Sequence, residues 1–328
     1  MGADDNHPMT ITMAIDGAVR LTHWGLIRAR GEEAAKFLQG QLTNDVASLT
    51  TGQARLAGFC SAKGRLQASF LVWKAADGDL MLACSASVLP ATLKRLSMFV
   101  MRSKCKLSDA SSELALWGFA GAPAAALAGD LVVGAARDAD GATVIRLPDA
   151  AGSARALSIV SADALPSAPA IALDAWRWLE VQAGIPIIEA ATVDQFVPQM
   201  LNYELIGGVD FQKGCYPGQE IVARSQYRGT IKRRMFLFEI DGVANGNSDA
   251  GHAPAAGQEV FHSSDAEQPA GMVVNAAPRP GAAGFGALVE VKSALLDSGS
   301  LHLGAAGGAL LRRTELPYTL PAEVTAPA

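Results

Sequence analysis

The segment Lys213-Gly214-Cys215-Tyr216-Pro217-Gly218-Gln219-Glu220 places a single cysteine in a turn made by two glycines and a proline. The glycines give the backbone freedom on both sides of Cys215, and the proline fixes its own φ near −65°. Residues 219–224 then predict a turn of helix, because proline is common at the start of helices. We therefore expect Cys215 to lie just ahead of a helix N-terminus.

This position favours negative charge on the sulfur of Cys215. The unpaired N–H groups of a helix N-terminus stabilise anions, and Lys213 and Arg224 add cations nearby in sequence. The thiolate is the form of cysteine that attacks electrophiles and binds metals. A free cysteine is, however, also a common small buried residue. The turn alone leaves two readings open, a reactive or cluster-ligating thiol and a packing residue.

The composition bounds the class of protein. A chain of 328 residues is too long for one ordinary core and indicates two or three domains. Half of the residues are hydrophobic and 18% are charged, so the chain has ample apolar surface to bury. The formal net charge of −5 gives no overall attraction to nucleic acid or to anionic membranes. Any site for a polyanion must therefore be a local patch.

The cysteines and histidines follow no metal-binding pattern. The four cysteines form no Cys-x-x-Cys pair, and the five histidines are scattered. This argues against a zinc site and against a disulfide framework, so we predict no metal site formed by the chain itself. We see no signal peptide and no run approaching 18 apolar residues. These features predict a cytoplasmic protein that does not enter a membrane.

Up to about residue 182, predicted strands and helices alternate irregularly. Period-two patterns predict strands over residues 24–30, 55–60, 67–73, 79–83, 103–108, 114–119, 143–147 and 155–160. Helical patterns cover residues 32–38, 89–100, 122–127 and 174–182, and residues 1–18 read as a loose arm. The strands are joined by short hairpin turns, which is typical of an α+β fold and not of a doubly wound sheet.

The last third of the chain changes character. After Arg234 the sequence predicts only short strands, at residues 235–240, 259–262, 271–275, 286–291, 301–303 and 309–312. Loops rich in Gly, Ala, Pro and Asp separate them. This pattern predicts a small antiparallel barrel as a separate C-terminal domain.

A basic segment lies between the cysteine turn and these strands. Six cations fall within 22 residues: Lys213, Arg224, Arg228, Lys232, Arg233 and Arg234. They could form a solvated face at a domain junction. They could also form a site for phosphate or for a ligand rich in carboxylates.

Several blocks of the sequence resemble one protein family. Residues 195–199, Asn202, Gly207-Gly208 and residues 213–224 are similar to the signature of the YgfZ family, folate-binding proteins related to the T protein (aminomethyltransferase) of glycine cleavage. Residues 37–46 and 60–64 resemble the N-terminal half of that family, and residues 316–318 resemble its end. The resemblance covers the chain from about residue 20 to about residue 320.

The resemblance implies a ring of three domains around a folate-binding channel. Two of them are α+β domains and the third is a C-terminal antiparallel β-barrel. We expect the first α+β domain to comprise residues 18–50 with 170–232, and the second to comprise residues 51–169. The barrel would comprise residues 233–320.

The resemblance also assigns site residues. Trp24 and Trp176 match two tryptophans that contact folate in the family, and Cys215 matches the family's functional thiol. The residues framing that thiol would be Lys213, Gly214, Tyr216, Gly218, Gln219, Glu220 and Arg224.

Two departures separate this chain from the aminomethyltransferases. Those enzymes carry an acidic pair after a glycine turn, whereas residues 65–69, directly after Gly64, include no carboxylate. The glutamate of their later helix falls on Gln182, and an amide cannot act as a general base. We therefore do not expect the aminomethyltransferase reaction.

Taken together, the resemblance implies a tetrahydrofolate-binding accessory protein in iron–sulfur cluster assembly or repair. It would indirectly support cluster-dependent enzymes such as tRNA-modifying ones. Its partners would be folate and iron–sulfur assembly or client proteins, and we expect a monomer. Cys215 could contact a cluster transiently, exchange with a partner's thiol, or react with a one-carbon unit on folate.

Two alternatives belong to other functional classes. One is a folate-dependent aminomethyl or one-carbon transferase, which needs an acid that the sequence does not reveal. The other is a direct RNA-binding module that uses the basic residues 224–234, although the net charge makes nucleic-acid binding the less expected outcome.

Overall fold

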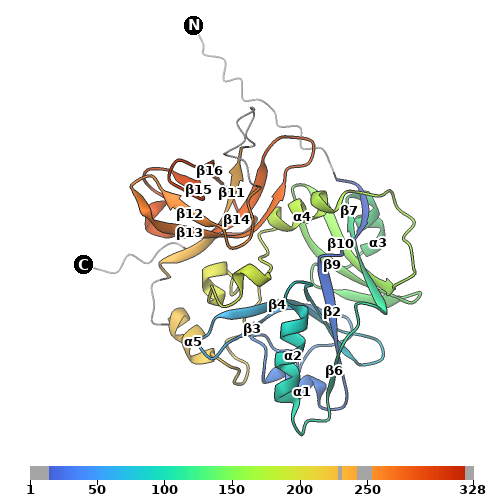
Figure 1. Ribbon diagram of the computed structural model, residues 1–328. Helices are drawn as coiled ribbons and strands as arrows, with labels where there is room; N and C mark the ends of the chain where they lie inside the picture. The colour runs from blue at the N-terminus through green and yellow to red at the C-terminus, as the bar shows by residue number, and fades with distance from the viewer. Residues whose placement is uncertain (1–14, 228–230, 242–252, 322–328) are drawn as a thin grey trace.

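The computed structural model describes residues 15–227, 231–241 and 253–321, which form three β-sheet units (Figure 1). Two units are open five-stranded sheets with helices, and the third is a closed barrel formed by the C-terminal part of the chain. The predicted α+β class with a C-terminal antiparallel barrel is confirmed. Among the described residues, no helix has the length and apolar character needed to cross a bilayer.

The first sheet has the strand order β3-β4-β5-β2-β6, and every neighbouring pair is antiparallel. Its strands are β2 (Trp24–Arg30), β3 (Ala54–Cys60), β4 (Leu66–Lys74), β5 (Leu80–Ser85) and β6 (Lys106–Asp109). Its helices are α1 (Ala34–Gln39) and α2 (Leu89–Val100). On α2, the side chains of Leu89, Thr92 and Leu96 face the core at helical spacing.

The second sheet has the order β1-β7-β10-β9-β8. Its strands are β1 (Gly17–Arg20), β7 (Leu114–Ala120), β8 (Ala136–Ala139), β9 (Ala142–Ala150) and β10 (Ser153–Ser161). Helices α3 (Ala122–Ala128) and α4 (Leu173–Gln182) pack against it. Because β1 pairs with β7, the whole first sheet is inserted in the chain between two neighbouring strands of the second.

This nesting corrects the predicted domain boundaries. Residues 18–50 and 51–169 were expected in different α+β domains, but β2 pairs directly with β5 and β6. The boundary at residue 50 is therefore wrong, because it cuts through a single sheet. The predicted arm lies largely outside the described residues, and its last two residues, Gly17 and Ala18, belong to β1.

The third unit is a closed barrel with the strand order β11-β14-β13-β12-β15-β16. Its strands are β11 (Arg233–Ile240), β12 (Glu259–His262), β13 (Asp265–Pro278), β14 (Phe285–Lys292), β15 (Leu301–Leu303) and β16 (Leu310–Thr314). All six predicted strands are present. Between α4 and the barrel lie two short 3-10 turns (Ala190–Thr192 and Pro198–Leu201) and α5 (Gln219–Tyr227); a third, Ser293–Leu295, follows β14.

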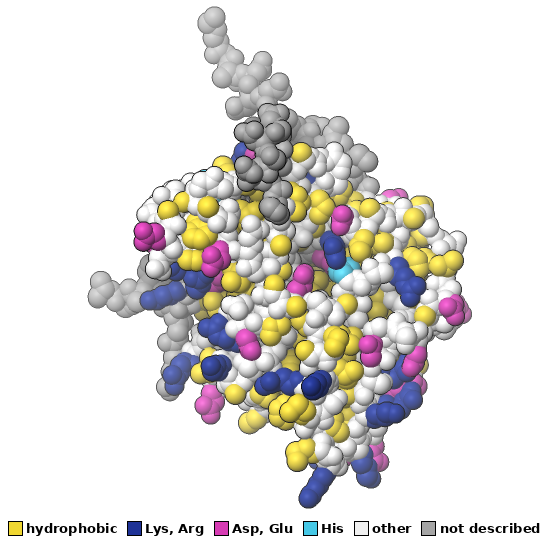
Figure 2. All heavy atoms as spheres, viewed as in Figure 1, with side chains coloured by type: hydrophobic (Ala, Val, Ile, Leu, Met, Phe, Trp, Pro, Cys, Tyr) yellow, Lys and Arg dark blue, Asp and Glu magenta, His cyan; other side chains and the backbone are white. Residues whose placement is uncertain are grey.

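On the face shown in Figure 2, basic and acidic side chains are interspersed over much of the surface.

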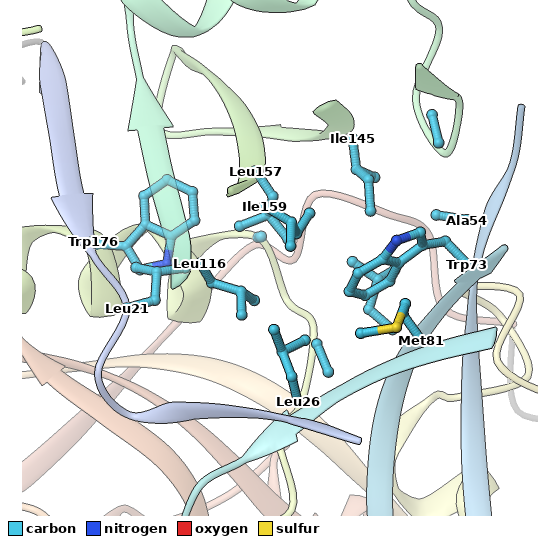
Figure 3. Packing of buried hydrophobic residues seen from close by; sticks show 14 of the residues in the cluster. Leu21, Leu26, Ala54, Trp73, Met81, Leu116, Ile145, Leu157, Ile159 and Trp176 are labelled. Atoms are coloured by element: carbon cyan, nitrogen blue, oxygen red, sulfur yellow. The ribbon is translucent and has the colours of Figure 1, made fainter. Parts of the chain in front are cut away.

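The two α+β sheets share one hydrophobic core (Figure 3). Leu26, Trp73 and Met81 come from the first sheet, and they share the core with residues of the second sheet and α4, which include Leu116, Ile145, Leu157, Ile159 and Trp176. The indole of Trp176 lies against Gly118 of β7, where a Cβ atom would be 2.7 Å from the ring carbons. Gly118 therefore makes room for α4 to pack on the second sheet.

Candidate functional site

The thiol turn, residues 213–218, holds Cys215 at the surface. Helix α5 begins at Gln219, directly after this turn, so the predicted helix is confirmed. Cys215 is exposed, whereas Cys60 and Cys84 are buried and Cys105 is half-buried. The packing alternative therefore does not hold for Cys215. Burial raises the pKa of Cys60 and of Cys84 to about 12, so those two thiols stay protonated at neutral pH.

Two glycines dock the thiol turn onto the first sheet. Gly218 has φ +79°, and a Cβ there would lie 2.4 Å from the carbonyl oxygen of Ser61. Gly64, in the turn between β3 and β4, has φ +69°, and a Cβ there would lie 2.8 Å from Ile221. Both positions combine positive φ with a close backbone approach, which only glycine tolerates. Two sequence blocks that are far apart thus meet next to Cys215.

Lys213 anchors the turn from the other side. Its Nζ donates hydrogen bonds to the carbonyl oxygens of Gln39 and Leu42, the latter at 2.5 Å, and so binds the end of α1. It also lies 5.1 Å from the ring centroid of Tyr216, which is buried. Burial lowers the pKa of Lys213 to about 8, although Asp45 and Asp210 act in the opposite direction. Lys213 fixes the turn as well as placing a cation near it.

The other framing residues lie on α5 or next to it. Glu220 is in the first turn of α5 and is exposed, while Gln219 is half-buried. Arg224 is exposed in the last turn of the helix, away from the N-terminus that follows the thiol. Gly214 has open space around its Cα.

Polar side chains connect the remaining motif blocks to this region. Thr43 Oγ1 donates to the carbonyl oxygen of Gly208 at 2.6 Å, and Asn44 Nδ2 donates to that of Gly207 at 2.7 Å. Gln199 Nε2 donates to the carbonyl oxygen of Val222 on α5 at 2.8 Å. The blocks therefore form one scaffold that holds the thiol turn between α1, the first sheet and α5.

The predicted tryptophans meet at a carboxylate that the sequence analysis did not identify. The Nε1 atoms of Trp24 and Trp176 each donate to Oε1 of Glu180 at 2.8 Å, and His23 Nε2 lies 2.9 Å from Oε2. Burial on its own would raise the pKa of Glu180, but the hydrogen bonds from His23, Trp24 and Trp176 outweigh it and hold the pKa below its usual range. Glu180 is thus a half-buried, ionised carboxylate.

This network bears on the roles expected of the two tryptophans and of Gln182. Trp176 is 0% exposed, so it has no free surface for stacking on folate, whereas Trp24 is half-buried and lines a groove of ≈ 410 Å³ with Arg20. Gln182, the position that the resemblance equates with the glutamate of the aminomethyltransferases, has its amide next to Gly286 of the barrel. Helix α4 nevertheless carries a carboxylate at Glu180, four residues after Trp176 and therefore on the same helix face.

A cavity of ≈ 1000 Å³ lies between the two α+β sheets, and the segments that follow α4 and β16 complete its walls. Apolar side chains of β3, β4 and β9 line it, together with Arg55, Arg146 and three carboxylates, Asp45, Asp149 and Asp210. Trp24 and Trp176 do not line it, but Ile185 borders both this cavity and a smaller pocket of ≈ 170 Å³ beside Glu180. The sequence analysis expected a folate-binding channel but did not identify these lining residues, because they come from segments far apart in the chain.

Internal bonds position the charged groups of the cavity. Arg55 Nη1 donates to the carbonyl oxygen of Asp45 at 2.5 Å and to Ser48 Oγ at 3.0 Å. A hydrogen bond from Ser48 lowers the pKa of Asp45, so that carboxylate is ionised at neutral pH. Arg146 Nη1 donates to the carbonyl oxygen of Leu147 at 2.6 Å, and the side chain also pairs with Asp149.

Most of the described cations of the basic segment form contacts within the protein. Arg233 forms an ion pair with Glu290, and Arg234 Nη1 lies 2.9 Å from Glu204 Oε1 and donates to Asn202 Oδ1 at 3.0 Å. Arg228 lies outside the described residues. Of the described members, Arg224 and Lys232 are the exposed ones.

Comparison with known proteins agrees with this geometry. A sequence profile of the GCVT N-terminal domain matches residues 13–147. The tRNA-modifying protein YgfZ of Klebsiella pneumoniae (strain 342) is 34% identical over 246 residues, which cover 70% of this chain and 73% of the relative. The protein of the same name from Serratia proteamaculans (strain 568) is 34% identical over 257 residues, 74% of each chain.

The fold has a counterpart among solved structures. Glycine cleavage system aminomethyltransferase T from Bartonella henselae superimposes with a TM-score of 0.69 over 93% of this chain and 86% of that chain, at 16% identity. Identity this low supports a shared fold only. The two relatives, in contrast, match more than two thirds of the chain at above 30% identity, and they confirm the resemblance seen in the sequence. The chain belongs to the YgfZ family.

Proposed function

We propose that this protein binds tetrahydrofolate in the cavity between its two α+β sheets. We further propose that it acts through Cys215 as a cytoplasmic accessory protein in iron–sulfur cluster assembly or repair. Cluster-dependent enzymes, tRNA-modifying ones among them, would depend on it indirectly. The observation that carries the proposal is the cavity of ≈ 1000 Å³. Asp210, which lines this cavity, comes shortly before the thiol turn in the chain.

The residues of the cavity suit folate. Its volume is at the upper end of the range for ligand pockets, about 300–1000 Å³, and its apolar walls suit a flat, elongated molecule. Arg55 and Arg146 offer guanidinium groups for the glutamate carboxylates, and the carboxylate of Asp210 offers acceptors for pterin N–H groups. Tetrahydrofolate would supply a carrier for one-carbon units. In this proposal Trp24 and Trp176 both act by holding Glu180, which lies beyond Ile185 from the cavity.

An iron–sulfur cluster would be cargo. The described residues contain no group of three or more His, Cys, Asp or Glu side chains that could hold a metal ion. A cluster that touches Cys215 would therefore take its remaining ligands from a partner. This favours a brief contact between the cluster and Cys215, or thiol exchange with a partner, over stable binding of the cluster by this protein.

Calorimetric titration with tetrahydrofolate tests the binding site. We expect saturable binding to the wild type. Ile206→Trp, which fills the cavity, should weaken it at least about tenfold, a loss of roughly 1.4 kcal/mol. Phe119→Leu, outside the cavity, serves as the control. If the folded wild type does not bind tetrahydrofolate, folate binding is excluded from the proposal. If Trp24→Phe weakens the binding and Ile206→Trp does not, the binding site is the groove lined by Trp24 and not the cavity.

A deletion strain tests the thiol. Cys215→Ser should fail to restore the activity of a cluster-dependent enzyme, whereas Cys105→Ser, a change at a half-buried thiol, should restore it. Full rescue by Cys215→Ser would exclude a functional role for the thiol, and the proposed folate binding would still stand.

A folate-dependent one-carbon transferase is the second candidate, and Glu180 favours it. That reaction needs an acid, and Glu180 is a half-buried ionised carboxylate separated from the cavity by Ile185. An assay for methylene-tetrahydrofolate with an aminomethyl donor separates the candidates. Turnover that is lost in Glu180→Gln would favour the transferase, and no turnover by a protein that binds folate would favour the accessory role.

A further inference from the structure

The C-terminal end of α2 and the loop after it present apolar side chains to solvent. We call residues 94–106 the α2 tip. Met98 is 68% exposed, Phe99 46% and Met101 86%, although α2 buries Leu96 on its opposite side. At the lower end of the molecule, where Figure 1 shows the loop after α2, apolar surface lies next to Lys and Arg side chains in Figure 2. These apolar residues contribute nothing to the core.

The loop of the α2 tip is held in one conformation. The backbone N–H of Lys104 donates to Glu33 Oε2 at 2.7 Å, and the backbone N–H of Glu33 donates to the carbonyl oxygen of Lys104 at 3.2 Å. Gly31 lies so close that a Cβ there would be 2.3 Å from the same carbonyl oxygen. The backbone that carries the apolar side chains is therefore fixed before any partner arrives, which lowers the entropy cost of binding.

The α2 tip is also strongly positive. Between Asp79 and Asp109 the sequence contains five cations and no carboxylate, in a chain of net charge −5. Lys104 pairs with Glu32, but no ion pair is recorded for Lys94, Arg95, Arg102 or Lys106 within residues 15–227, 231–241 and 253–321. Stabilisation of the helix dipole does not explain them, because the last turn of α2 holds no basic residue.

We propose that the α2 tip docks an acidic segment of a partner protein that also carries apolar side chains. Methionine, aromatic residues and arginine are enriched where proteins bind one another, and methionine adapts to varied partner surfaces. The surrounding cations complement carboxylates and speed the encounter. This surface is separate from the cavity and from Cys215, and the proposal does not depend on either.

An anionic membrane is the other surface that such chemistry could meet, and the observations favour a protein. Glu32, with 65% of its side chain exposed, and Glu33 lie at the base of the α2 tip. Their charge and the net charge of −5 would oppose approach to a broad anionic bilayer. A protein segment needs to contact only the tip.

Fluorescence anisotropy with the full-length protein tests the proposal. The probe is a labelled helical peptide of roughly 16 residues made of Leu and Glu, and its control carries Gln in place of Glu. We expect saturable binding of the acidic peptide only. Met98→Gln with Met101→Gln, and separately Arg95→Glu with Arg102→Glu, should each weaken it about tenfold or more. Binding should also fall as salt rises from about 50 to about 300 mM.

The matched controls lie on other faces. Leu165→Gln changes an apolar residue that is 83% exposed, and Lys292→Glu changes an exposed cation at the end of β14; both should bind like the wild type. All the changed residues are exposed, so each variant should keep the unfolding midpoint of the wild type. The proposal is overturned if the wild type does not bind the acidic peptide or if the reversed-charge variant binds it equally well. Binding to phosphatidylserine vesicles in place of the peptide would also overturn it.

Discussion

Trp24 Nε1 donates to Glu180 Oε1 at 2.8 Å and so joins the first strand of one α+β sheet to the helix that packs on the other. The same oxygen accepts the indole N–H of Trp176. One carboxylate therefore sets the position of both tryptophans that the family resemblance singles out.

Removing that carboxylate should destabilise the protein. Glu180→Ala leaves two indole N–H groups without their acceptor, and we expect a loss of about 3 kcal/mol in the free energy of unfolding. Glu180→Gln keeps an acceptor oxygen and should lose about 1 kcal/mol. Urea denaturation measures both, with Glu32→Ala as an exposed control. Equal losses of stability in Glu180→Ala and Glu180→Gln would show that the indole hydrogen bonds to Glu180 are not the source of its stabilising effect.

The stabilising effect of Glu180 should depend on pH. Its pKa is lower in the folded protein than in the unfolded chain, so its contribution is present above the unfolded value of about 4.3 and is lost as pH falls through the folded value. The difference in unfolding free energy between wild type and Glu180→Gln should therefore shrink below about pH 4. Urea titrations at successively lower pH measure it. A difference that stays constant over that range would contradict the lowered pKa.

Gly218 should be intolerant of a side chain, and Gly207 offers a matched control. Both have positive φ, but a Cβ on Gly218 meets the Ser61 carbonyl at 2.4 Å, whereas nothing lies within 4 Å of one on Gly207. Gly207→Ala should cost about 1 kcal/mol for its backbone alone, and Gly218→Ala clearly more. Gly218→Ala should also change the rate at which Cys215 reacts with a thiol reagent. Equal stabilities and equal rates would count against the docking role of Gly218.

Arg234 should contribute to the stability of the fold and not to RNA binding. Its partner Glu204 has 4% of its side chain exposed, so Arg234→Ala leaves a buried carboxylate unpaired and should cost about 3 kcal/mol. The exposed pair of Arg312 with Asp241 supplies the control, since Arg312→Ala should cost at most about 1 kcal/mol. Thermal and urea unfolding compare the two. If Arg234→Ala left stability intact but abolished binding to tRNA, the RNA alternative would return.

The sequence predicted what depends on neighbouring residues. The strand over residues 24–30 has the bounds expected from alternation, and the six barrel strands were all found. Strand β1 was missed because its first residues were assigned to the N-terminal arm, and β8 (Ala-Arg-Asp-Ala) was missed because it has no apolar alternation. The nesting was missed because strand pairing depends on distant segments, and nothing within residues 24–30 shows that they pair with residues 80–85.

For the candidate site too, the sequence predicted the local features and missed those that depend on distant segments. The turn around Cys215 and the helix after it follow from local glycine and proline chemistry. Glu180 had a local signal, its spacing of four from Trp176, but its bond to Trp24 connects residues far apart in the chain. The two arginines of the cavity, Arg55 and Arg146, have no local sequence signal, because they lie on different sheets and only the packing of the two sheets brings them to one cavity.

The insertion of one sheet within the other has a consequence for dissecting the molecule. Residues 24–109 begin and end on the paired strands β2 and β6, so they form a continuous polypeptide that two cuts would separate from the rest. The same piece contributes Leu26, Trp73 and Met81 to the shared core, and alone it would leave them in water. The two fragments should therefore stay bound to each other after cleavage and reassociate when mixed, as a noncovalently complemented protein.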